Sequence, residues 1–96
     1  MKYINDQNVL IEVAKTDSDE LVRGEAVKFI GDQSALVYIV KTDSHPFVRR
    51  TAVDRIENQS VINDIWDNDP DSSVRNAAFK RSEKFTSQWW DQKEKN

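Results

Sequence analysis

Hydrophobic residues recur along the chain with the spacing expected of helices. In residues 9–14, apolar side chains are separated by one, four and five positions, which places them on one face of a helix. Five further segments show closely related spacing. The six segments are residues 9–14, 22–30, 36–40, 48–56, 61–66 and 74–79. The pattern therefore predicts six short amphipathic helices.

These segments repeat with a period of 26 residues. The stretch TDSHPFVRRTAV at 42–53 has counterparts in TDSDELVRGEAV at 16–27 and NDPDSSVRNAAF at 68–79. The repeating units are residues 5–30, 31–56 and 57–82. The first two units are identical at 12 of 26 positions, and no insertion breaks the register. We therefore expect three copies of one helix pair.

One segment, ALVYIV at 35–40, has the composition of a buried strand, because Val, Tyr and Ile favour sheets. Its counterparts in the other units, VLIEVA and VINDIW, have a clear helical pattern. Since the three units share one register, we expect a helix here too. A largely apolar helix fits the middle unit, which is covered on both sides.

An aspartate begins the connection between the two halves of each unit. Asp17, Asp43 and Asp69 are predicted to be the N-caps of the second helices, because aspartate accepts hydrogen bonds from unpaired N–H groups. Asp17 and Glu20 have the spacing of a capping box. Pro70 would then occupy the first helical position, where its missing N–H costs nothing.

The composition is that of one folded domain spanning residues 1–96. The chain is 38% hydrophobic and 32% charged, with a net charge of −3. The absence of cysteine excludes disulfides, thiolate zinc sites and a cysteine nucleophile. No stretch approaches the roughly 20 apolar residues of a membrane span, and the first residues do not have the pattern of a signal peptide. We therefore expect a cytoplasmic protein without a membrane partner.

The recurring Asp, Val-Arg and Ala positions resemble the HEAT-like repeat. In the second unit the matching residues are Asp43, Val48, Arg49 and Ala52, and the resemblance extends over residues 5–82. A unit of 26 residues is shorter than the roughly 40–47 of most HEAT repeats, and it is closer to the compact bacterial repeats of phycobilisome-lyase type. The resemblance implies an all-α fold, an α-solenoid of about three stacked helix pairs.

In that family the recurring Asp and Arg residues form a ladder along the stack. The resemblance therefore implies a structural role for Asp17, Arg23, Asp43, Arg49, Asp69 and Arg75. The residues themselves agree, because a charge between apolar neighbours needs a partner and each arginine follows an aspartate by six positions. The alternative is that three aligned arginines bind an anionic ligand. The constant offset favours the structural interpretation.

The residues after 82 depart from the repeat. Ser82 stands where the first two units have Ile30 and Ile56. Because the last unit of a stack exposes an apolar face, we expect residues 83–96 to form a C-terminal cap with a short helix near 86–93.

Three aromatic residues in this C-terminal part allow two interpretations. Phe85, Trp89 and Trp90 could cover the end of the last unit. They could instead contact a partner or a second copy, so that self-association would occur through Trp89 and Trp90. Adjacent tryptophans cannot both face inward from one helix. The cap is the preferred interpretation.

Candidates for catalysis and metal binding are few. The only histidine, His45, precedes a proline in an expected loop and has no nucleophile at motif spacing. Two glycines in the whole chain exclude a glycine-rich phosphate loop. Asp67, Asp69 and Asp71 alternate, but the glycine and glutamate of a calcium loop are missing. We therefore expect no enzyme activity, no cofactor and no metal site.

The predicted partner surface is the side of the second helices that lies outside the apolar stripe. Its residue types differ from unit to unit, and in the resembling family this side tends to line the concave face. The positions on this side are Glu25, Lys28, Arg50, Thr51, Asp54, Asn76, Ala77 and Lys80, and the predicted contacts among them are Glu25, Lys28, Arg50, Thr51, Asp54 and Lys80. We therefore expect a small scaffold that binds another protein or peptide.

The alternative function is nucleic-acid binding, because some DNA glycosylases are HEAT-like and hold the duplex in a basic concave face. Residues 49–96 are rich in arginine and lysine, but they contain nine basic and nine acidic residues. A DNA-binding surface usually has a basic excess. Specific nucleic-acid binding is therefore not expected.

Overall fold

The structure, a computed structural model, describes residues 6–94, and it describes side chains over residues 6–83. The described chain contains six helices: α1 (Gln7–Thr16), α2 (Glu20–Val27), α3 (Gln33–Thr42), α4 (Pro46–Val53), α5 (Gln59–Asn68) and α6 (Ser72–Glu94). No strand occurs in residues 6–94, so the all-α prediction is confirmed. The segment ALVYIV belongs to α3 and is helical, as the repeat register predicted.

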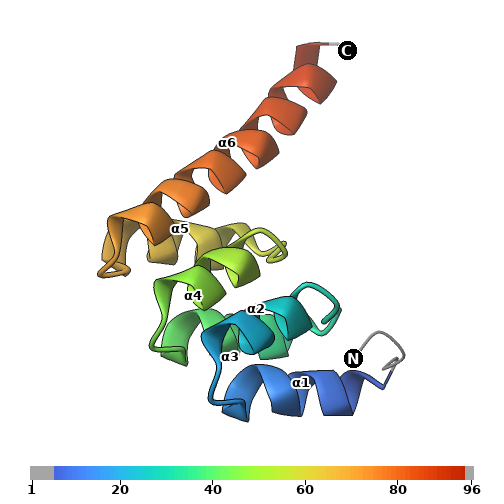
Figure 1. Ribbon diagram of the computed structural model, residues 1–96. Helices are drawn as coiled ribbons and strands as arrows, with labels where there is room; N and C mark the ends of the chain where they lie inside the picture. The colour runs from blue at the N-terminus through green and yellow to red at the C-terminus, as the bar shows by residue number, and fades with distance from the viewer. Residues whose placement is uncertain (1–5, 95–96) are drawn as a thin grey trace.

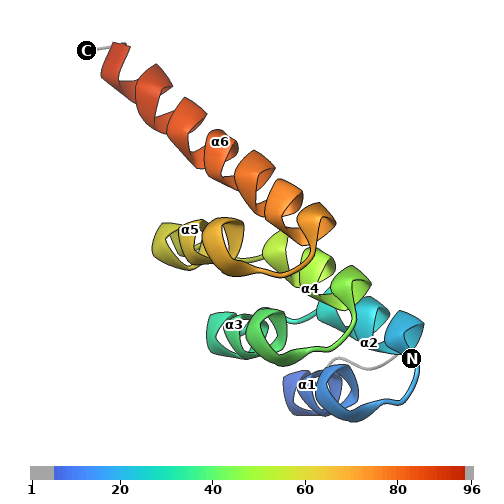
Figure 2. The ribbon, with the colours of Figure 1, turned by 90° about the vertical axis from the view of Figure 1, so that its left-hand side faces the viewer.

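The helices form two layers. α1, α3 and α5 succeed one another in one layer, and α2, α4 and the first part of α6 form the other (Figure 1; Figure 2). Each helix of the first layer packs against the helix that follows it in the chain, and α4 also packs against α2 and α6. The molecule is elongated, with extents of 47 × 29 × 18 Å.

The core lies between the two layers and is continuous from one unit to the next. Equivalent positions of the three units are buried, as Leu10, Leu36 and Ile62 show. The side chains of Ile30 and Ile56, at the turns that end the first two units, are also fully buried. The hydrophobic spacing thus positions the polar side chains on the outer faces and at the junctions between units.

The predicted N-caps are wrong by two residues. Asp17, Asp43 and Asp69 end the first helices as C-caps, and each accepts a side-chain hydrogen bond from the N–H two residues later. The N-caps of α2 and α4 are Asp19 and His45. A cap must precede its helix directly, whereas the chain needs extended residues here to reverse its direction.

Two related predictions are corrected for the same reason. Asp17 and Glu20 do not form a capping box, because the cap of α2 is Asp19. Pro70 lies before α6 and not at its first position, which is Ser72. Pro46, by contrast, is the first residue of α4, where a missing N–H is harmless.

The expected separate helix near 86–93 is also wrong, because α6 runs without a break from Ser72 to Glu94. In the first two units, a buried isoleucine, Ile30 or Ile56, follows the end of the second helix. Two residues later, Asp32 or Asn58 caps the next helix. The equivalent residues of the third unit are Ser82 and Lys84. Neither supplies the same signal, so the helix continues.

Candidate functional site

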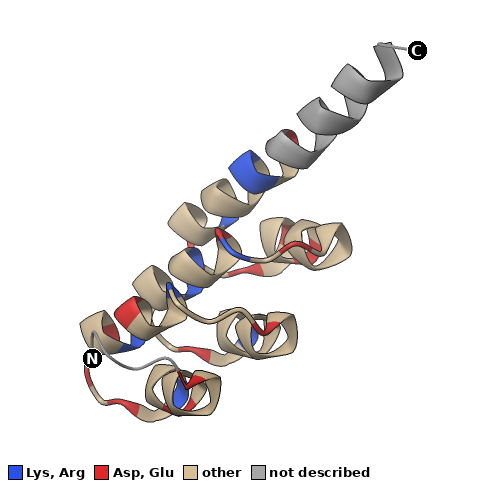
Figure 3. Cartoon of the chain, turned by 90° about the vertical axis from the view of Figure 1, so that its right-hand side faces the viewer, with Lys and Arg blue, Asp and Glu red and all other residues tan. Residues whose placement is uncertain are grey.

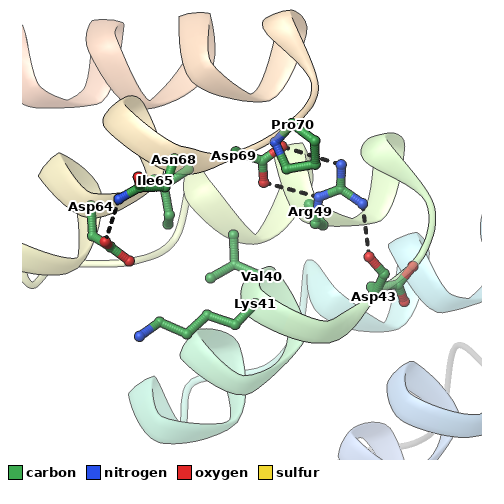
Figure 4. A pocket seen from close by; sticks show the side chains of 9 residues that line it. All are labelled: Val40, Lys41, Asp43, Arg49, Asp64, Ile65, Asn68, Asp69 and Pro70. Carbon is green, nitrogen blue, oxygen red and sulfur yellow. Dashed lines mark hydrogen bonds and ion pairs between the residues drawn. The ribbon is translucent and has the colours of Figure 1, made fainter.

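Arg49 links two units through the junction between them. From α4 its Nε donates to Asp69 Oδ2 over 3.0 Å and its Nη2 donates to Asp69 Oδ1 over 3.2 Å. Its Nη1 donates to the Asp43 carbonyl oxygen over 2.8 Å. Only 10% of the Arg49 side chain and 5% of the Asp69 side chain are exposed. Figure 4 shows the guanidinium between these two aspartates, at the edge of a cavity of about 350 Å³.

The first junction repeats this geometry at Arg23. Its Nε and Nη2 donate to the two oxygens of Asp43 over 2.9 and 3.2 Å, and its Nη1 donates to the Asp17 carbonyl over 2.7 Å. The hydrogen bond to Asp43 raises the pKa of the Arg23 guanidinium above its ordinary value. Each of these two forks is therefore filled by a carboxylate of the following unit, which leaves little room for an anionic ligand.

The third arginine differs. Arg75 donates Nη1 to the Asp69 carbonyl over 2.7 Å, as the other two do to theirs. No carboxylate of the described residues meets its Nε and Nη2. The residue 20 positions later, where Asp43 and Asp69 follow their arginines, is Lys95.

Two glutamines fasten successive units and were not singled out from the sequence. Gln7 donates to the Phe29 carbonyl and accepts from the Gly31 N–H, over 3.0 and 2.9 Å. Gln33 makes the same pair of bonds to Arg55 and Glu57. The signal was visible, because a glutamine recurs at this position in all three units.

A further pair of arginines ties the second helices together. Arg55 Nε donates to the Ile30 carbonyl and Arg81 Nε to the Ile56 carbonyl, each over 3.1 Å. These bonds satisfy carbonyl groups at the turns that end the first two units. From the sequence alone, both residues are recognisable only as basic charges.

Four of the six residues predicted to bind a partner line one groove between α4 and α6. The groove has a volume of about 470 Å³ and is lined by Arg50, Thr51, Asp54, Ser73, Asn76, Ala77, Lys80 and Arg81. Among the described lining residues, Arg50, Lys80 and Arg81 are basic and Asp54 is acidic, whereas the whole chain has a net charge of −3. Asn76 and Ala77 lie on the predicted side of the second helices, whereas Ser73 and Arg81 were not part of the predicted surface.

Arg50 is held in place at the rim of this groove. Its Nη1 donates to Ser73 Oγ over 2.9 Å, and its guanidinium lies 5.9 Å from the centre of the Phe47 ring. The remaining N–H groups of the guanidinium are donors for a ligand. Figure 3 shows the basic and acidic residues along α4 and the first part of α6.

The two other predicted surface residues do not line the groove. Glu25 and Lys28 lie on the exposed side of α2 and its C-cap, where Lys28 Nζ donates to Glu25 Oε1 over 2.8 Å. The side chains of Phe85, Trp89 and Trp90, for which the sequence allows a cap or a contact, lie outside the described residues.

His45 has a capping role. Its Nδ1 accepts from the Phe47 N–H over 3.2 Å, and its Nε2 lies 3.5 Å from Glu20 Oε1 of the preceding unit. Within residues 6–83, no group of three His, Asp or Glu side chains is arranged to hold a metal ion. None of the helices in the described chain is both long enough and apolar enough to span a bilayer.

Comparison of the chain with protein-family models, with curated proteins and with solved structures found no match.

Proposed function

We propose that this chain is a small HEAT-like α-solenoid that acts as a scaffold and binds an acidic segment of another polypeptide in the groove between α4 and α6. The observation that carries the proposal is the groove itself, where Arg50 and Lys80 lie together among the described lining residues and the Arg50 guanidinium keeps donors for a ligand. Opposite charge across an interface favours encounter and selects the partner.

The solenoid part of the proposal is supported by the repeated junctions. The same arginine–aspartate geometry joins the first unit to the second and the second to the third, at Arg23–Asp43 and Arg49–Asp69. The same layers continue across all three units (Figure 2). Such a stack presents its second helices as one surface, on which adjacent helices form shallow grooves.

The groove suits a peptide better than a small molecule. It is open and shallow, and most of its lining side chains are polar. Small-molecule sites are usually concave and mostly apolar. Aspartate or glutamate side chains of a peptide can accept hydrogen bonds from the Arg50 guanidinium, and Lys80 adds a second cation near it.

Selection from a random-peptide display library on the full-length protein would test the proposal. We expect the selected peptides to be rich in Asp and Glu. The combined changes Arg50→Glu and Lys80→Glu should weaken a selected peptide at least about tenfold, which corresponds to roughly 1.4 kcal/mol. Lys41→Glu on α3, outside the groove, is the matched control and should leave binding unchanged.

Two results would contradict the proposal. One is a set of selected peptides without acidic enrichment. The other is binding that survives the double change in a protein whose circular dichroism spectrum shows that it is folded. Tight, salt-sensitive binding of a short DNA duplex that is lost in the same variant would replace the peptide with a nucleic acid.

A further inference from the structure

The third unit leaves exposed what the first two units bury. Trp66 on α5 is 42% exposed, whereas its equivalents Ala14 and Val40 are 0% and 2% exposed. Phe79 on α6 is 36% exposed, whereas its equivalents Val27 and Val53 are fully buried. In the first two units, these positions are covered by the unit that follows. The two rings pack against each other, with centroids 4.9 Å apart.

Arg75 lies at the same end of the molecule, and no acceptor among the described residues meets its Nε and Nη2. Arg23 and Arg49 use Nε and Nη2 to hold a carboxylate of the next unit, but Arg75 meets no carboxylate among the described residues. A partly buried arginine and a pair of exposed aromatic rings in the same unit form a surface that matches a carboxylate next to apolar groups.

The opposite end of the molecule carries that complement. Asp17 is the first-unit equivalent of Asp43 and Asp69. Its Oδ1 accepts the Asp19 N–H, and no arginine of the described residues reaches the carboxylate. Val9, Leu21 and Phe29 are exposed at the same end, with 62% of Leu21 accessible.

The two ends also match in register. At the first junction the ring of Phe47 lies against Gly24. At the second junction, Arg50 donates a hydrogen bond to Ser73. Ser73 is the equivalent of Phe47 and Arg50 is the equivalent of Gly24, so the same two positions of the unit meet at both junctions. At a third junction of the same kind, Leu21 of a second copy would face Asn76, while its Asp17 would face Arg75. Val9 shows the corresponding burial change, because it is 41% exposed and its equivalent Ala35 is 7% exposed.

We infer that this chain associates head to tail with a second copy of itself, through the salt bridge Arg75–Asp17 and the packing of Trp66 and Phe79 against the first unit of that copy. The contact continues the junction that occurs twice within the chain. It is heterologous, so each added copy leaves one free end of each kind and growth remains open. α6 extends beyond this end of the stack (Figure 1).

Sedimentation of the full-length protein over roughly 10 µM to 1 mM tests the inference, because this range of concentrations detects weak association. We expect the average mass to rise steadily with concentration and not to stop at a dimer. A mass that stays at the monomer value throughout, or one that levels off at a dimer, would overturn the inference.

Charge exchange gives the sharper test. Arg75→Asp leaves an acid at both ends, and Asp17→Arg leaves an arginine at both ends, so each variant alone should remain monomeric. Mixing the two variants restores one acid and one arginine at every contact, and association should return. If both variants lose association and the mixture does not regain it, the proposed contact between Arg75 and Asp17 is wrong.

A second variant keeps the test independent of the local role of Asp17 in its turn. Leu21→Glu changes a side chain that is already 62% exposed, so the fold should be kept while the contact is lost. Tyr38→Glu, at an exposed position on the outer side of α3, is the matched control and should associate like the wild type. Equal association of Leu21→Glu and Tyr38→Glu would overturn the inference. Peptide binding in the groove should be unchanged in both variants.

Discussion

Arg49 and Asp69 are joined by two parallel hydrogen bonds, 3.0 and 3.2 Å long, although 20 residues separate them in the chain. Both side chains are almost completely buried at the junction between the second and third units. A buried pair of this kind need not stabilise a protein more than apolar residues would, but loss of one partner strands the other charge. The pair therefore fixes the way in which one unit is placed on the next.

Arg49→Ala is expected to lower the free energy of unfolding by about 3 kcal/mol, because it leaves the Asp69 carboxylate buried without its cation. Arg75→Ala is the matched control and should cost only about 1 kcal/mol, because Arg75 bonds a single carbonyl. Urea denaturation at concentrations where the chain is monomeric measures both values. Equal losses would show that the carboxylate contact contributes nothing.

Gln33 and Gln59 provide a comparison at equivalent positions. Gln33→Ala removes two hydrogen bonds to the turn between α4 and α5 and should cost about 1 kcal/mol. Gln59→Ala should cost less than about 0.5 kcal/mol, because α6 continues where that turn would lie. Thermal denaturation of the two variants measures the two losses of stability. A larger loss for Gln59→Ala than for Gln33→Ala would contradict the stabilising role given to the Gln33 hydrogen bonds.

Gly24 is a glycine in the middle of α2 because Phe47 of the next unit lies against it. A Cβ at this position would approach Phe47 Cε2 within 2.3 Å. Gly24→Ala should therefore destabilise the wild type, even though alanine favours a helix by about 1 kcal/mol over glycine.

The same change should become stabilising once the ring is removed. In a Phe47→Ala background, Gly24→Ala should gain up to about 1 kcal/mol, because only the helix preference remains. The four proteins form a double-mutant cycle measured by urea unfolding. A stabilising effect of Gly24→Ala in the wild-type background would show that the ring moves aside without cost.

The pH dependence of the free energy of unfolding should report on Asp32 and Asp71, which cap α3 and α6. Hydrogen bonds from Ser34 lower the pKa of Asp32, and those from Ser73 lower the pKa of Asp71. A carboxyl whose pKa is lower in the folded state stabilises the protein above its unfolded pKa, near 3.9, and this contribution is lost as the pH falls through the folded value.

Stability should therefore decline below about pH 4, and Asp32→Asn should flatten that decline. Thermal melts between about pH 2 and pH 7 measure how steeply stability declines with falling pH. Asparagine at position 32 still caps the helix but does not titrate. Asp54→Asn is a control, because Asp54 is exposed and accepts no side-chain capping bond in the structure. An unchanged acid slope in Asp32→Asn would contradict the capping assignment.

The sequence by itself determined the helical class, the 26-residue period and most of the buried positions, because helical spacing and repetition are local properties. Val9, Trp66 and Phe79 lie on the predicted apolar faces but are exposed. It also marked Arg50, Thr51, Asp54 and Lys80 as outward-facing residues, since they lie off the apolar stripe.

Only the tertiary structure decided which units each polar residue connects. Arg49 could reach an aspartate of its own unit or of the next, and the stacking geometry gives it the carboxylate of the next and the carbonyl of its own. The N-cap of α2 is Asp19 and not the predicted Asp17 for a similar reason, because the path of a reversing chain depends on the packing of both helices. The groove and the exposed ends at Trp66 and Leu21 also arise from stacking, because burial by a neighbouring unit is a property of the assembled layers and not of the local sequence.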